Sequence, residues 1–331
     1  MNDLPDEFEL IRRLAATQRG VHEDVVLGIG DDGAVLEPVR GAQLVAVCDT
    51  LVAGRHFPED TDAFAIGWKA LAVNLSDLAA MGATPQWALL ALTLPERDAV
   101  WVERFGSGFA TLAKMSGVAL VGGDTTRGPL TITVTALGAV APAAALRRDG
   151  AQVGDRVCVA GVFGEAALGL LAVQAQRRDD PAFAHCIARL DRPEPQLALG
   201  QALVGIASAC IDVSDGLVAD LGHVAAASGV GIRLDLDAVP HPPFDLGKAL
   251  DLNARAVIDL ALGGGDDYLL AFTMAADRLP ELRERVAALG LELHAIGVVV
   301  PGAGVSVVTR EGGDHVPARV GFNHFGNDDG E

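Results

Sequence analysis

Residues 69–83 of this chain read KALAVNLSDLAAMGA, an apolar stretch that carries one amide, Asn74, and one carboxylate, Asp77. The apolar residues follow a helical spacing over 62–81, and Asp62 is the expected N-cap. Asn74 and Asp77 are three residues apart, so they share one face of the predicted helix. A carboxylate on an apolar helix needs a partner, because burying it alone is costly. The stretch therefore predicts a buried helix that presents an acidic group for a purpose other than packing.

Other aspartates occur in glycine-rich turns beside predicted strands or helices. A single turn of this kind is weak evidence, because Asp and Gly are ordinary turn residues. Five such turns together with Asp77 are more informative, since carboxylates that converge repel one another and require cations. All-oxygen ligands select hard ions, above all Mg²⁺, which is the usual partner of phosphate groups. The turns are Gly28-Ile29-Gly30-Asp31-Asp32, Cys48-Asp49-Thr50, Gly122-Gly123-Asp124-Thr125-Thr126, Asp212-Val213-Ser214-Asp215-Gly216 and Gly264-Gly265-Asp266-Asp267.

The common nucleotide-binding motifs do not fit this sequence. No GxxxxGK[ST] segment occurs, so the chain is not a P-loop enzyme, and neither GxSxG nor HExxH is present. Residues 28–33, GIGDDG, have the spelling of a GxGxxG dinucleotide motif. Their two acidic side chains would face the phosphates, which opposes that interpretation. The sequence instead predicts an enzyme that handles ATP phosphates through aspartate-bound Mg²⁺.

Length and composition restrict the classes of protein that remain. A chain of 331 residues is long for one core and comfortable for two. The 44 acidic residues outnumber the 25 Lys and Arg and give a net charge of −19, which repels nucleic acid and anionic membranes. The four cysteines are scattered without a CxxC, so neither a zinc site nor a disulfide framework is indicated. The first ten residues, MNDLPDEFEL, lack the apolar core of a signal peptide, and we expect a cytoplasmic protein.

Helical and strand patterns alternate in both halves, which predicts an α/β protein. The Ala- and Pro-rich residues 141–154 indicate a boundary between two domains, 1–141 and 142–331. Helices are expected over 6–17, 62–81, 97–116, 165–176, 196–208, 217–228, 254–262 and 279–289. Strands are expected over 25–27, 43–48, 85–94, 118–121, 129–140, 156–160, 209–213, 268–273 and 292–300.

The order and spacing of these segments resemble the thiamine-monophosphate kinase family over nearly the whole chain. The wider superfamily includes aminoimidazole ribonucleotide synthetase, selenophosphate synthetase and a hydrogenase-maturation enzyme. The resemblance implies the two-domain aminoimidazole ribonucleotide synthetase-like fold of mixed α/β class. It also implies an N-terminal domain that binds ATP and Mg²⁺ and forms a homodimer, and a C-terminal domain that completes the active-site cleft. The matching segments are 27–32, 49–57, 69–83, 122–128, 211–217 and His324-Phe325, of which 69–83 is the most specific.

The family reaction implied by the resemblance is ATP + thiamine phosphate → ADP + thiamine diphosphate, assisted by several Mg²⁺ ions. The nucleophile is a phosphate oxygen that is already ionised at pH 7, so no residue is expected to act as a general base. We expect direct transfer without a phosphoenzyme. By family pattern, the expected Mg²⁺ ligands are Asp31, Asp49, Asp77, Asp124, Asp212 and Asp215, with the neighbouring Cys48. The expected ATP contacts are Gly123, Asp124, Arg148 and Ser214, and the expected substrate contacts are His56, Asp266, Arg319 and Phe322.

Three departures from the family pattern concern mainly the acceptor. Cys48 replaces a common Thr and is a poor Mg²⁺ ligand except through its backbone carbonyl. Asp266 is one methylene shorter than the usual Glu. Arg319 aligns with a Trp that packs on thiamine, and because a guanidinium repels the cationic thiazolium, Phe322 is the better candidate for stacking. Lys69 is expected on the helix surface.

Two other hypotheses stay open. One is another ATP-dependent enzyme of the same superfamily that acts on a different acceptor. The second is a catalytically silent protein that binds metal or serves as a scaffold.

Overall fold

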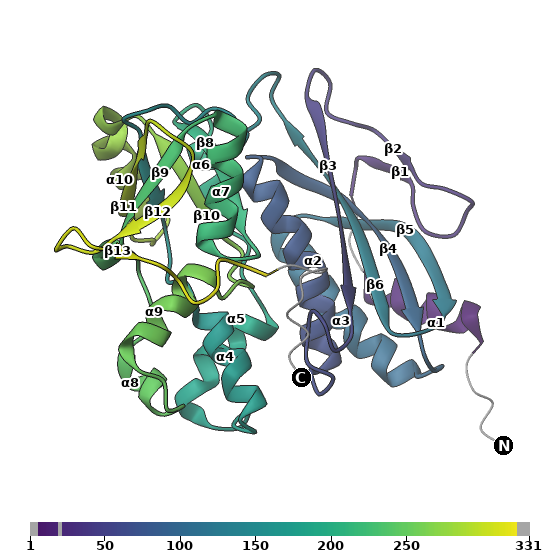
Figure 1. Cartoon of the computed structure of the whole chain (residues 1–331). Coiled ribbons are helices and arrows are strands. Elements are labelled where there is room, and N and C mark those ends of the chain that lie inside the picture. Colours follow the sequence, from purple (N-terminus) through teal and green to yellow (C-terminus); the bar gives the residue numbers. More distant parts are fainter. Residues whose placement is uncertain (1–5, 19–21, 323–331) are drawn as a thin grey trace. The chain divides into compact units, whose positions relative to one another are not determined.

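The computed structural model describes residues 6–18 and 22–322 (Figure 1). The chain forms two compact units. Unit 1 comprises Met1–Leu78 and Ala83–Ala143, and unit 2 comprises Ala79–Gly82 and Ala144–Glu331. Within the described part of the chain, every helix is too short or too polar to cross a membrane. The expectations for the first five residues and for His324-Phe325 lie outside the described residues.

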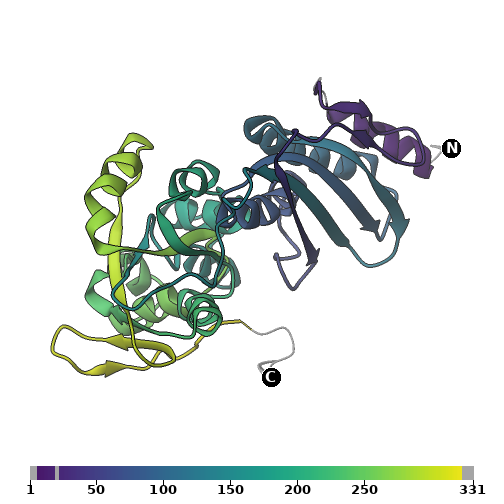
Figure 2. The same cartoon turned by 90° about the horizontal axis from the view of Figure 1, so that it is seen from above.

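Unit 1 is built on a four-stranded sheet in the order β3-β6-β4-β5, in which only β4 and β5 run parallel. Helices α2 and α3 lie on one face of this sheet (Figure 1). Helix α1 and the β1–β2 ribbon lie together at one edge of the unit (Figure 2). The elements are α1 (Glu7–Thr17), β1 (Val25–Leu27), β2 (Val35–Leu36), β3 (Gln43–Val52), α2 (Ala63–Ala80), β4 (Thr84–Leu94), α3 (Ala99–Ser116), β5 (Ala119–Arg127) and β6 (Thr131–Val140).

The two faces of this sheet follow from residue alternation. In β6, Ile132, Val134 and Ala136 are buried, whereas Thr133 and Thr135 on the other face are only half-buried. Alternate side chains of a strand point to opposite faces, so the buried set faces the helices. The register of the sheet therefore tells which face each site residue of β3, β4 and β5 occupies.

Helix α2 carries Asn74 and Asp77 and includes residues 69–80 of the apolar stretch 69–83. It begins where expected, with the backbone N–H of Phe64 donating to Asp62 Oδ1 at 3.0 Å. Gly82 follows its end with a φ of +67°, a conformation that favours glycine. The expectation that Lys69 lies on the helix surface is wrong, because its side chain is only 1% exposed. The cause is that α2 is buried nearly all round and offers no surface face for a long polar side chain.

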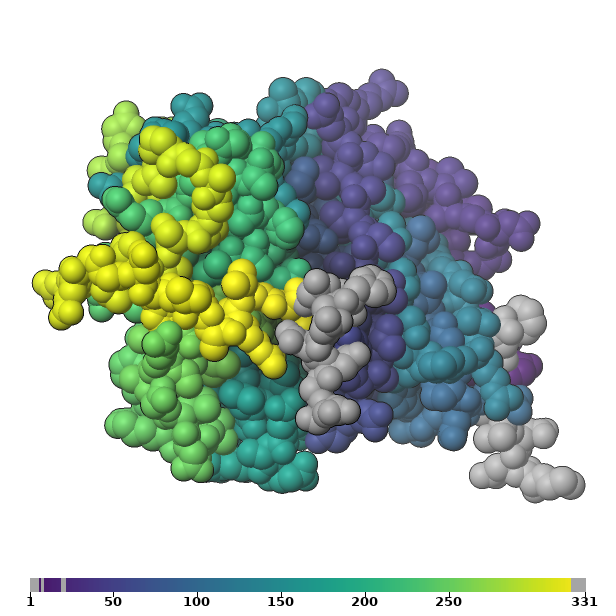
Figure 3. Space-filling view, in the orientation of Figure 1, coloured from purple at the N-terminus to yellow at the C-terminus, as the bar shows by residue number. Residues whose placement is uncertain are grey.

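Unit 2 contains a seven-stranded sheet in the order β13-β12-β9-β11-β7-β10-β8. All pairs are antiparallel except β12 with β9. In Figure 3, the C-terminal residues drawn in yellow lie across the green surface of this unit. The α-helices and strands are β7 (Arg156–Val159), α4 (Glu165–Gln174), α5 (Ala184–Asp191), α6 (Leu197–Leu203), β8 (Ala207–Val213), α7 (Leu217–Ser228), β9 (Gly231–Asp235), α8 (Phe244–Lys248), α9 (Ala254–Gly263), β10 (Leu269–Met274), α10 (Leu279–Ala288), β11 (His294–Val300), β12 (Gly304–Val308) and β13 (Asp314–His315). The mixed α/β class predicted from the sequence is confirmed in both units.

One predicted element of unit 2 is wrong in extent. A single helix was expected over 196–208, but α6 ends at Leu203 and β8 begins at Ala207. Gly205 separates them with a φ of +74°, which a helix cannot accommodate. The apolar residues on both sides of Gly205 gave no local sign of this change, because a short apolar run fits a buried helix and a buried strand equally well.

Candidate active site

In unit 1, the structure brings Asp49 and Asp77 together. Asp49 of β3 pairs with Val134 of β6, and therefore its side chain lies on the helix-covered face of the sheet. The buried Asn74 of α2 accepts the backbone N–H of Asp49 through Oδ1 at 3.1 Å. Its Nδ2 donates to the carbonyl of Ala70 at 3.1 Å, which fixes the amide orientation. Asn74 thus attaches the strand that carries Asp49 to the helix that carries Asp77.

The carboxyl groups of Asp49 and Asp77 are hydrogen-bonded to each other. Burial raises the pKa of Asp49 above its ordinary value, while the bond to Asp77 and the nearby His56 oppose that shift. Two carboxyls can share a hydrogen bond only when one is protonated, so the ionised pair requires a cation. Mg²⁺ is commonly held by one or two carboxylates together with phosphate oxygens and water. The donor set of this pair fits that ion.

His56 lies close enough to Asp49 to lower its pKa electrostatically. Its Nδ1 accepts the backbone N–H of Val52 at 3.0 Å. A nitrogen that accepts a hydrogen bond carries no proton, so Nε2 bears the proton of the neutral ring. The local turn thus sets the tautomer of a predicted substrate contact.

Other predicted residues of unit 1 lie elsewhere on the sheet. Cys48 pairs with Thr135, and its Sγ accepts the Thr135 hydroxyl at 3.4 Å on the face opposite the Asp49 carboxylate. Asp124 of β5 pairs with Ala91 and so shares the face of Cys48, with an exposed side chain. Asp31, also exposed, lies in the loop between β1 and β2, where its Oδ1 accepts the backbone N–H of Asp32 at 2.8 Å.

Gly123 precedes Asp124 in β5, and its backbone passes very close to β4. A Cβ at this position would lie 1.8 Å from the carbonyl oxygen of Leu90. Its φ of +153° is also a conformation that L side chains rarely adopt. Only glycine fits at position 123. The close approach of β5 to β4 therefore accounts for the glycine at this predicted ATP contact.

In unit 2, three segments meet at the carboxyl end of β8. The first is the turn of residues 212–216, which connects β8 to α7. The second is the loop of residues 263–268, in which the Asp266 N–H donates to Ser214 O at 2.7 Å. The third is the segment of residues 319–322, in which the Phe322 N–H donates to Asp215 O at 3.0 Å. We call this arrangement the three-segment cluster.

The three-segment cluster is compact because glycines line its contacts. A Cβ on Gly263 would lie 2.3 Å from the Arg319 carbonyl, and one on Gly265 would lie 2.7 Å from the Ser214 carbonyl. Larger residues would therefore separate the segments. The cluster contains five of the predicted site residues, Ser214, Asp215, Asp266, Arg319 and Phe322. Asp212 lies near the end of β8, the strand that leads into the cluster.

Asp266 is held in an unusual conformation within this cluster. Its φ is +61° and that of Tyr268 is +50°, in the left-handed region that non-glycine residues seldom occupy. The Tyr268 hydroxyl donates to Asp266 Oδ1 at 3.1 Å. Such backbone conformations persist only where surrounding structure imposes them, and they are often found at functional sites.

Arg148 lies beside β8, because the Cys210 N–H donates to the carbonyl of Arg147 at 2.8 Å. The exposed Arg148 side chain is close enough to Cys210 to act on it electrostatically. Arg147, by contrast, forms an ion pair with Asp149. Arg148 therefore lies beside Cys210, which is two residues before Asp212 in β8.

The sequence assigned no role to two buried carboxyls, Asp220 and Asp267. Asp220, in the first turn of α7, accepts the backbone N–H groups of the 214–216 turn. Its pKa is raised to about 7, first by burial and then by the negative charge of Asp215. The buried Asp267 accepts the Gly164 N–H at 2.9 Å, and burial raises its pKa well above the ordinary value. The available signal was the spacing of Asp220 from Ser214 and Asp215 at the start of an apolar helix.

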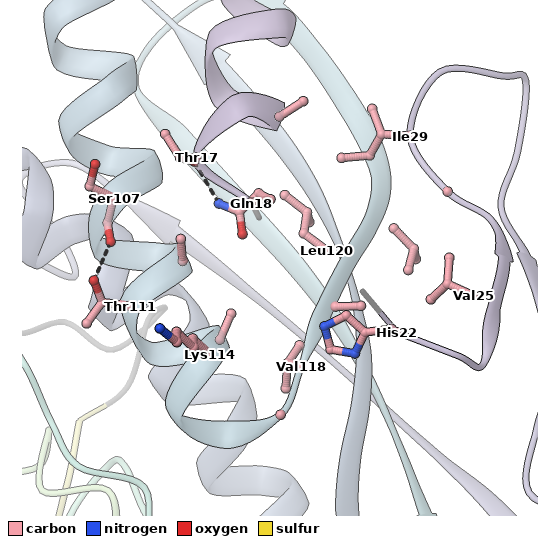
Figure 4. Close-up of a pocket in the computed structure, with 17 residues that line it drawn as sticks. Thr17, Gln18, His22, Val25, Ile29, Ser107, Thr111, Lys114, Val118 and Leu120 are labelled. Carbon is pink, nitrogen blue, oxygen red and sulfur yellow. Dashed lines mark hydrogen bonds between the residues drawn. The ribbon is translucent and has the colours of Figure 1, made fainter. Parts of the chain in front are cut away.

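A pocket of about 840 Å³ lies between α1, α3 and the start of β5 (Figure 4). Its polar residues include His22, Thr111 and Lys114, and none of the predicted site residues lines it. Among residues 6–18 and 22–322, no group of three or more His, Cys, Asp or Glu side chains is arranged to hold a metal ion by itself.

Comparison with known proteins is consistent with this geometry. Residues 30–140 match the family model of the N-terminal domain of AIR synthase related protein, and residues 152–310 match that of its C-terminal domain. The thiamine-monophosphate kinase of Salmonella typhimurium (strain LT2) is 42% identical over 321 residues, which cover 96% of this chain and 98% of that protein. The chain belongs to the thiamine-monophosphate kinase family.

Solved members of the thiamine-monophosphate kinase family have the same fold. The crystal structure of the enzyme from Stenotrophomonas maltophilia K279a matches with a TM-score of 0.84 and 48% identity, covering 91% of this chain and 96% of that one. The complex of AaThiL with AMPPCP and TMP matches with a TM-score of 0.77 and 33% identity, covering 96% and 97%. The hydrogenase-maturation protein HypE of E. coli, at 21% identity and a TM-score of 0.77, shares the fold alone.

Proposed function

We propose that this chain transfers the γ-phosphate of ATP to thiamine phosphate, giving ADP and thiamine diphosphate. The observation that carries the proposal is the three-segment cluster, which holds residues assigned to Mg²⁺, to ATP and to the substrate in one backbone-bonded unit. A relative that is 33% identical over most of both chains has been solved with AMPPCP, an ATP analogue, and TMP. Family membership supports the same reaction.

The proposed site residues keep the roles that the family pattern implies. Mg²⁺, when bound, would neutralise the phosphate charges that otherwise keep two anions apart. Its proposed ligands are Asp31, Asp49, Asp77, Asp124, Asp212 and Asp215, with the Cys48 backbone carbonyl, since the Cys48 thiol faces away from Asp49. The proposed ATP contacts are Gly123, Asp124, Arg148 and Ser214, and those to thiamine phosphate are His56, Asp266, Arg319 and Phe322.

The proposed reaction requires little proton transfer by side chains of the protein. The attacking oxygen of thiamine phosphate is already ionised near pH 7, so the side chains position reactants rather than act as a general base. Asp266, fixed by Tyr268, supplies an anion that suits the positive thiazolium. Phe322 is 46% exposed and can offer an aromatic face to the same ring. Transfer is direct, and the stereochemistry at an isotopically chiral γ-phosphate should therefore invert.

We further propose that the protein works as a cytoplasmic homodimer, with residues 1–141 carrying the dimer contact and the nucleotide and Mg²⁺ roles of unit 1. The support is the sheet face of unit 1 that α2 and α3 leave uncovered. On that face Leu44 of β3 is 54% exposed and Leu89 of β4 is 38% exposed. A contiguous exposed apolar patch on a sheet face is one of the features that mark a protein interface. Sedimentation of a Leu89→Asp variant should shift from dimer to monomer.

The reaction is tested by measuring ADP release with thiamine phosphate, thiamine and aminoimidazole precursors as acceptors. Only thiamine phosphate should stimulate release, and thiamine diphosphate should form in equal amount. Asp212→Asn should lower kcat by about 100-fold or more, because a charge at the proposed metal site is lost. The exposed Asp179→Asn is the matched control and should retain the parent rate. Stimulation by an aminoimidazole precursor alone would favour the other superfamily reaction, and no stimulation would refute both.

A further inference from the structure

One carboxylate oxygen in unit 2 accepts three consecutive backbone N–H groups. Asp220 Oδ2 lies 3.1 Å from the nitrogen of Ser214, 3.0 Å from that of Asp215 and 3.1 Å from that of Gly216. Asp220 is only 4% exposed. Three hydrogen bonds that converge on one oxygen define the conformation of the turn closely. Gly216, the N-cap of α7, has no capping side chain, and Asp220 reaches back from the first turn of the helix to accept the N–H of Gly216 itself.

The carbonyl side of the same turn is bonded as well. Ser214 O accepts the Asp266 N–H, and Asp215 O accepts the Phe322 N–H. The N–H groups of the turn therefore converge on Asp220, while its carbonyls hold the two segments assigned to the substrate. If the N–H side were released, the peptide planes could rotate, and both substrate segments would lose their attachment point. Asp220 thus contacts the backbone of the turn, whereas the side chains of Ser214 and Asp215 are assigned to ATP and Mg²⁺.

Burying Asp220 at this position costs folding free energy, which argues that its three hydrogen bonds have a role that offsets the cost. A buried carboxylate close to Asp212 and Asp215 experiences both desolvation and like-charge repulsion. An apolar residue at this position of α7 would avoid both costs and would pack with Leu217 and Leu221 on the buried side of the helix. It would also leave three N–H groups, one of them buried and two part-buried, without this acceptor.

We propose that Asp220 is a positioning residue for the proposed kinase reaction, fixing the Ser214–Gly216 turn so that its side chains and both attached segments are pre-arranged for the reactants. This inference rests on the proposed function. The proposed role depends on an oxygen that accepts the three N–H groups and not on the negative charge of Asp220. Substitutions can separate these two properties. Residues that orient the groups around a metal site commonly contribute about 10- to 100-fold to affinity or activity.

Three substitutions separate acceptor geometry from charge. Asp220→Asn keeps an oxygen in place without the charge, Asp220→Glu keeps the charge but displaces the oxygen by one methylene, and Asp220→Ala removes both. We expect kcat to stay within about 3-fold of the parent in the Asn variant and to fall about 10- to 100-fold in the Ala variant, with the Glu variant between them. KM for thiamine phosphate and the Mg²⁺ concentration for half-maximal rate should rise in the same order.

The matched control is Asp98→Ala. Asp98 caps α3 in unit 1 by accepting the N–H groups of Val100 and Trp101, and it touches none of the proposed site residues. Its loss should lower thermal stability to a similar extent without changing the Mg²⁺ requirement or KM. Equal kinetics in the Asp220→Ala and Asp98→Ala enzymes, per folded protein, would overturn the inference. So would a Glu variant that is more active than the Asn variant, because charge would then be the contribution of Asp220.

A second measurement stands independently of catalysis. Hydrogen exchange at the amides of Ser214, Asp215 and Gly216, followed in the nucleotide-free protein, should be protected in the parent and in Asp220→Asn and should accelerate in Asp220→Glu. The comparison of the Asn and Glu variants still tests the positioning role if the Ala variant does not fold. Unchanged exchange in the Glu variant overturns the positioning role. Accelerated exchange in a protein that does not phosphorylate thiamine phosphate would refute the proposed function while leaving the structural inference standing.

Discussion

Cys48 differs from the three other cysteines in its access to solvent. Its thiol is exposed, whereas Cys158, Cys186 and Cys210 are buried. Burial raises the pKa of Cys158 to about 12 and that of Cys186 to about 11, and it also raises that of Cys210. The thiolate is the reactive form, so the three buried thiols react slowly for two reasons: the reagent cannot reach them, and little thiolate forms. We expect Ellman's reagent to titrate one thiol in the native Leu89→Asp variant, in which this sheet face is free of the proposed dimer contact, and four after denaturation.

The same reagent tests the side-chain direction of Cys48. Its Sγ lies on the sheet face opposite the Asp49 carboxylate, so labelling should proceed at the same rate with and without Mg²⁺. The variant Cys48→Ser should show no fast-reacting thiol, which assigns the signal. Strong protection by Mg²⁺ alone, in the absence of nucleotide, would contradict this placement and would indicate that the thiol itself faces a metal ion.

Helices α2 and α3 of unit 1 pack so closely that two glycines are required at their crossing. A Cβ on Gly67 would lie 2.0 Å from the carbonyl oxygen of Phe105, and one on Gly108 would lie 1.9 Å from that of Phe64. Neither contact can be relieved by rotating a side chain, because both partners are backbone atoms. Gly67→Ala and Gly108→Ala should each lower the free energy of unfolding by about 3 kcal/mol, measured by urea denaturation.

The matched control for this prediction is Gly222→Ala. Gly222 lies in α7, and a Cβ there would meet nothing within 4 Å. Alanine has the higher helix propensity, so this change should stabilise unit 2 by roughly 0.5–1 kcal/mol. If Gly67→Ala were as well tolerated as Gly222→Ala, the close crossing of α2 and α3 would be wrong.

Elements with a local signal could be predicted, and elements defined by distant partners could not. The N-cap at Asp62 and the periodicity of α2 gave its bounds closely. Strands β9 and β12, by contrast, pair with each other although more than 60 residues separate them, and neither was predicted. Helix α5 begins without a capping side chain and was also missed. Strand β3 continues to Val52, beyond the predicted residue 48, because β6 offers it a full-length partner.

The candidate site shows the same division. The spacing of Asn74 and Asp77 on one helix face is a local property, and both side chains do meet β3. Family spacing named the residues of the three-segment cluster. It could not reveal that Phe322 bonds to Asp215, because that contact spans more than 100 residues. Nor could it reveal Asp220 as the acceptor of the turn, since a carboxylate in the first turn of a helix is usually a surface residue.

At the scale of the whole chain, buried carboxyls make stability depend on pH in a defined direction. Burial raises the pKa values of Asp49 in unit 1 and of Asp220 and Asp267 in unit 2. For Asp220 the ordinary value is 3.8 and the folded value is about 7. Between these values the folded protein holds a proton that the unfolded chain has released. The stability contributed by that proton is present at low pH and is lost as pH rises through about 7.

We therefore expect the metal-free protein to become less stable between pH 5 and pH 8, in contrast to the usual behaviour of paired surface carboxylates. Asp220 alone corresponds to roughly 3 kcal/mol over this range, because its pKa in the folded protein is about 7 and the range begins at pH 5. Urea denaturation in EDTA at constant ionic strength measures the slope, and Asp220→Asn should reduce it. Stability that is flat or rises over this range would contradict the prediction.

Mg²⁺ should act against this slope. The ion binds ionised carboxylates and not protonated ones, so it competes with protons for the Asp49–Asp77 pair and for the acidic turn of unit 2. A ligand that binds only the folded chain stabilises it by RT ln(1 + [L]/Kd), so tighter binding gives a larger gain at the same concentration. The gain in stability from millimolar Mg²⁺ should therefore be small at pH 5 and largest at pH 8. A gain that is equal at both pH values would place the ion away from these carboxyls and would remove the main support for aspartate-held Mg²⁺ in a chain of net charge −19.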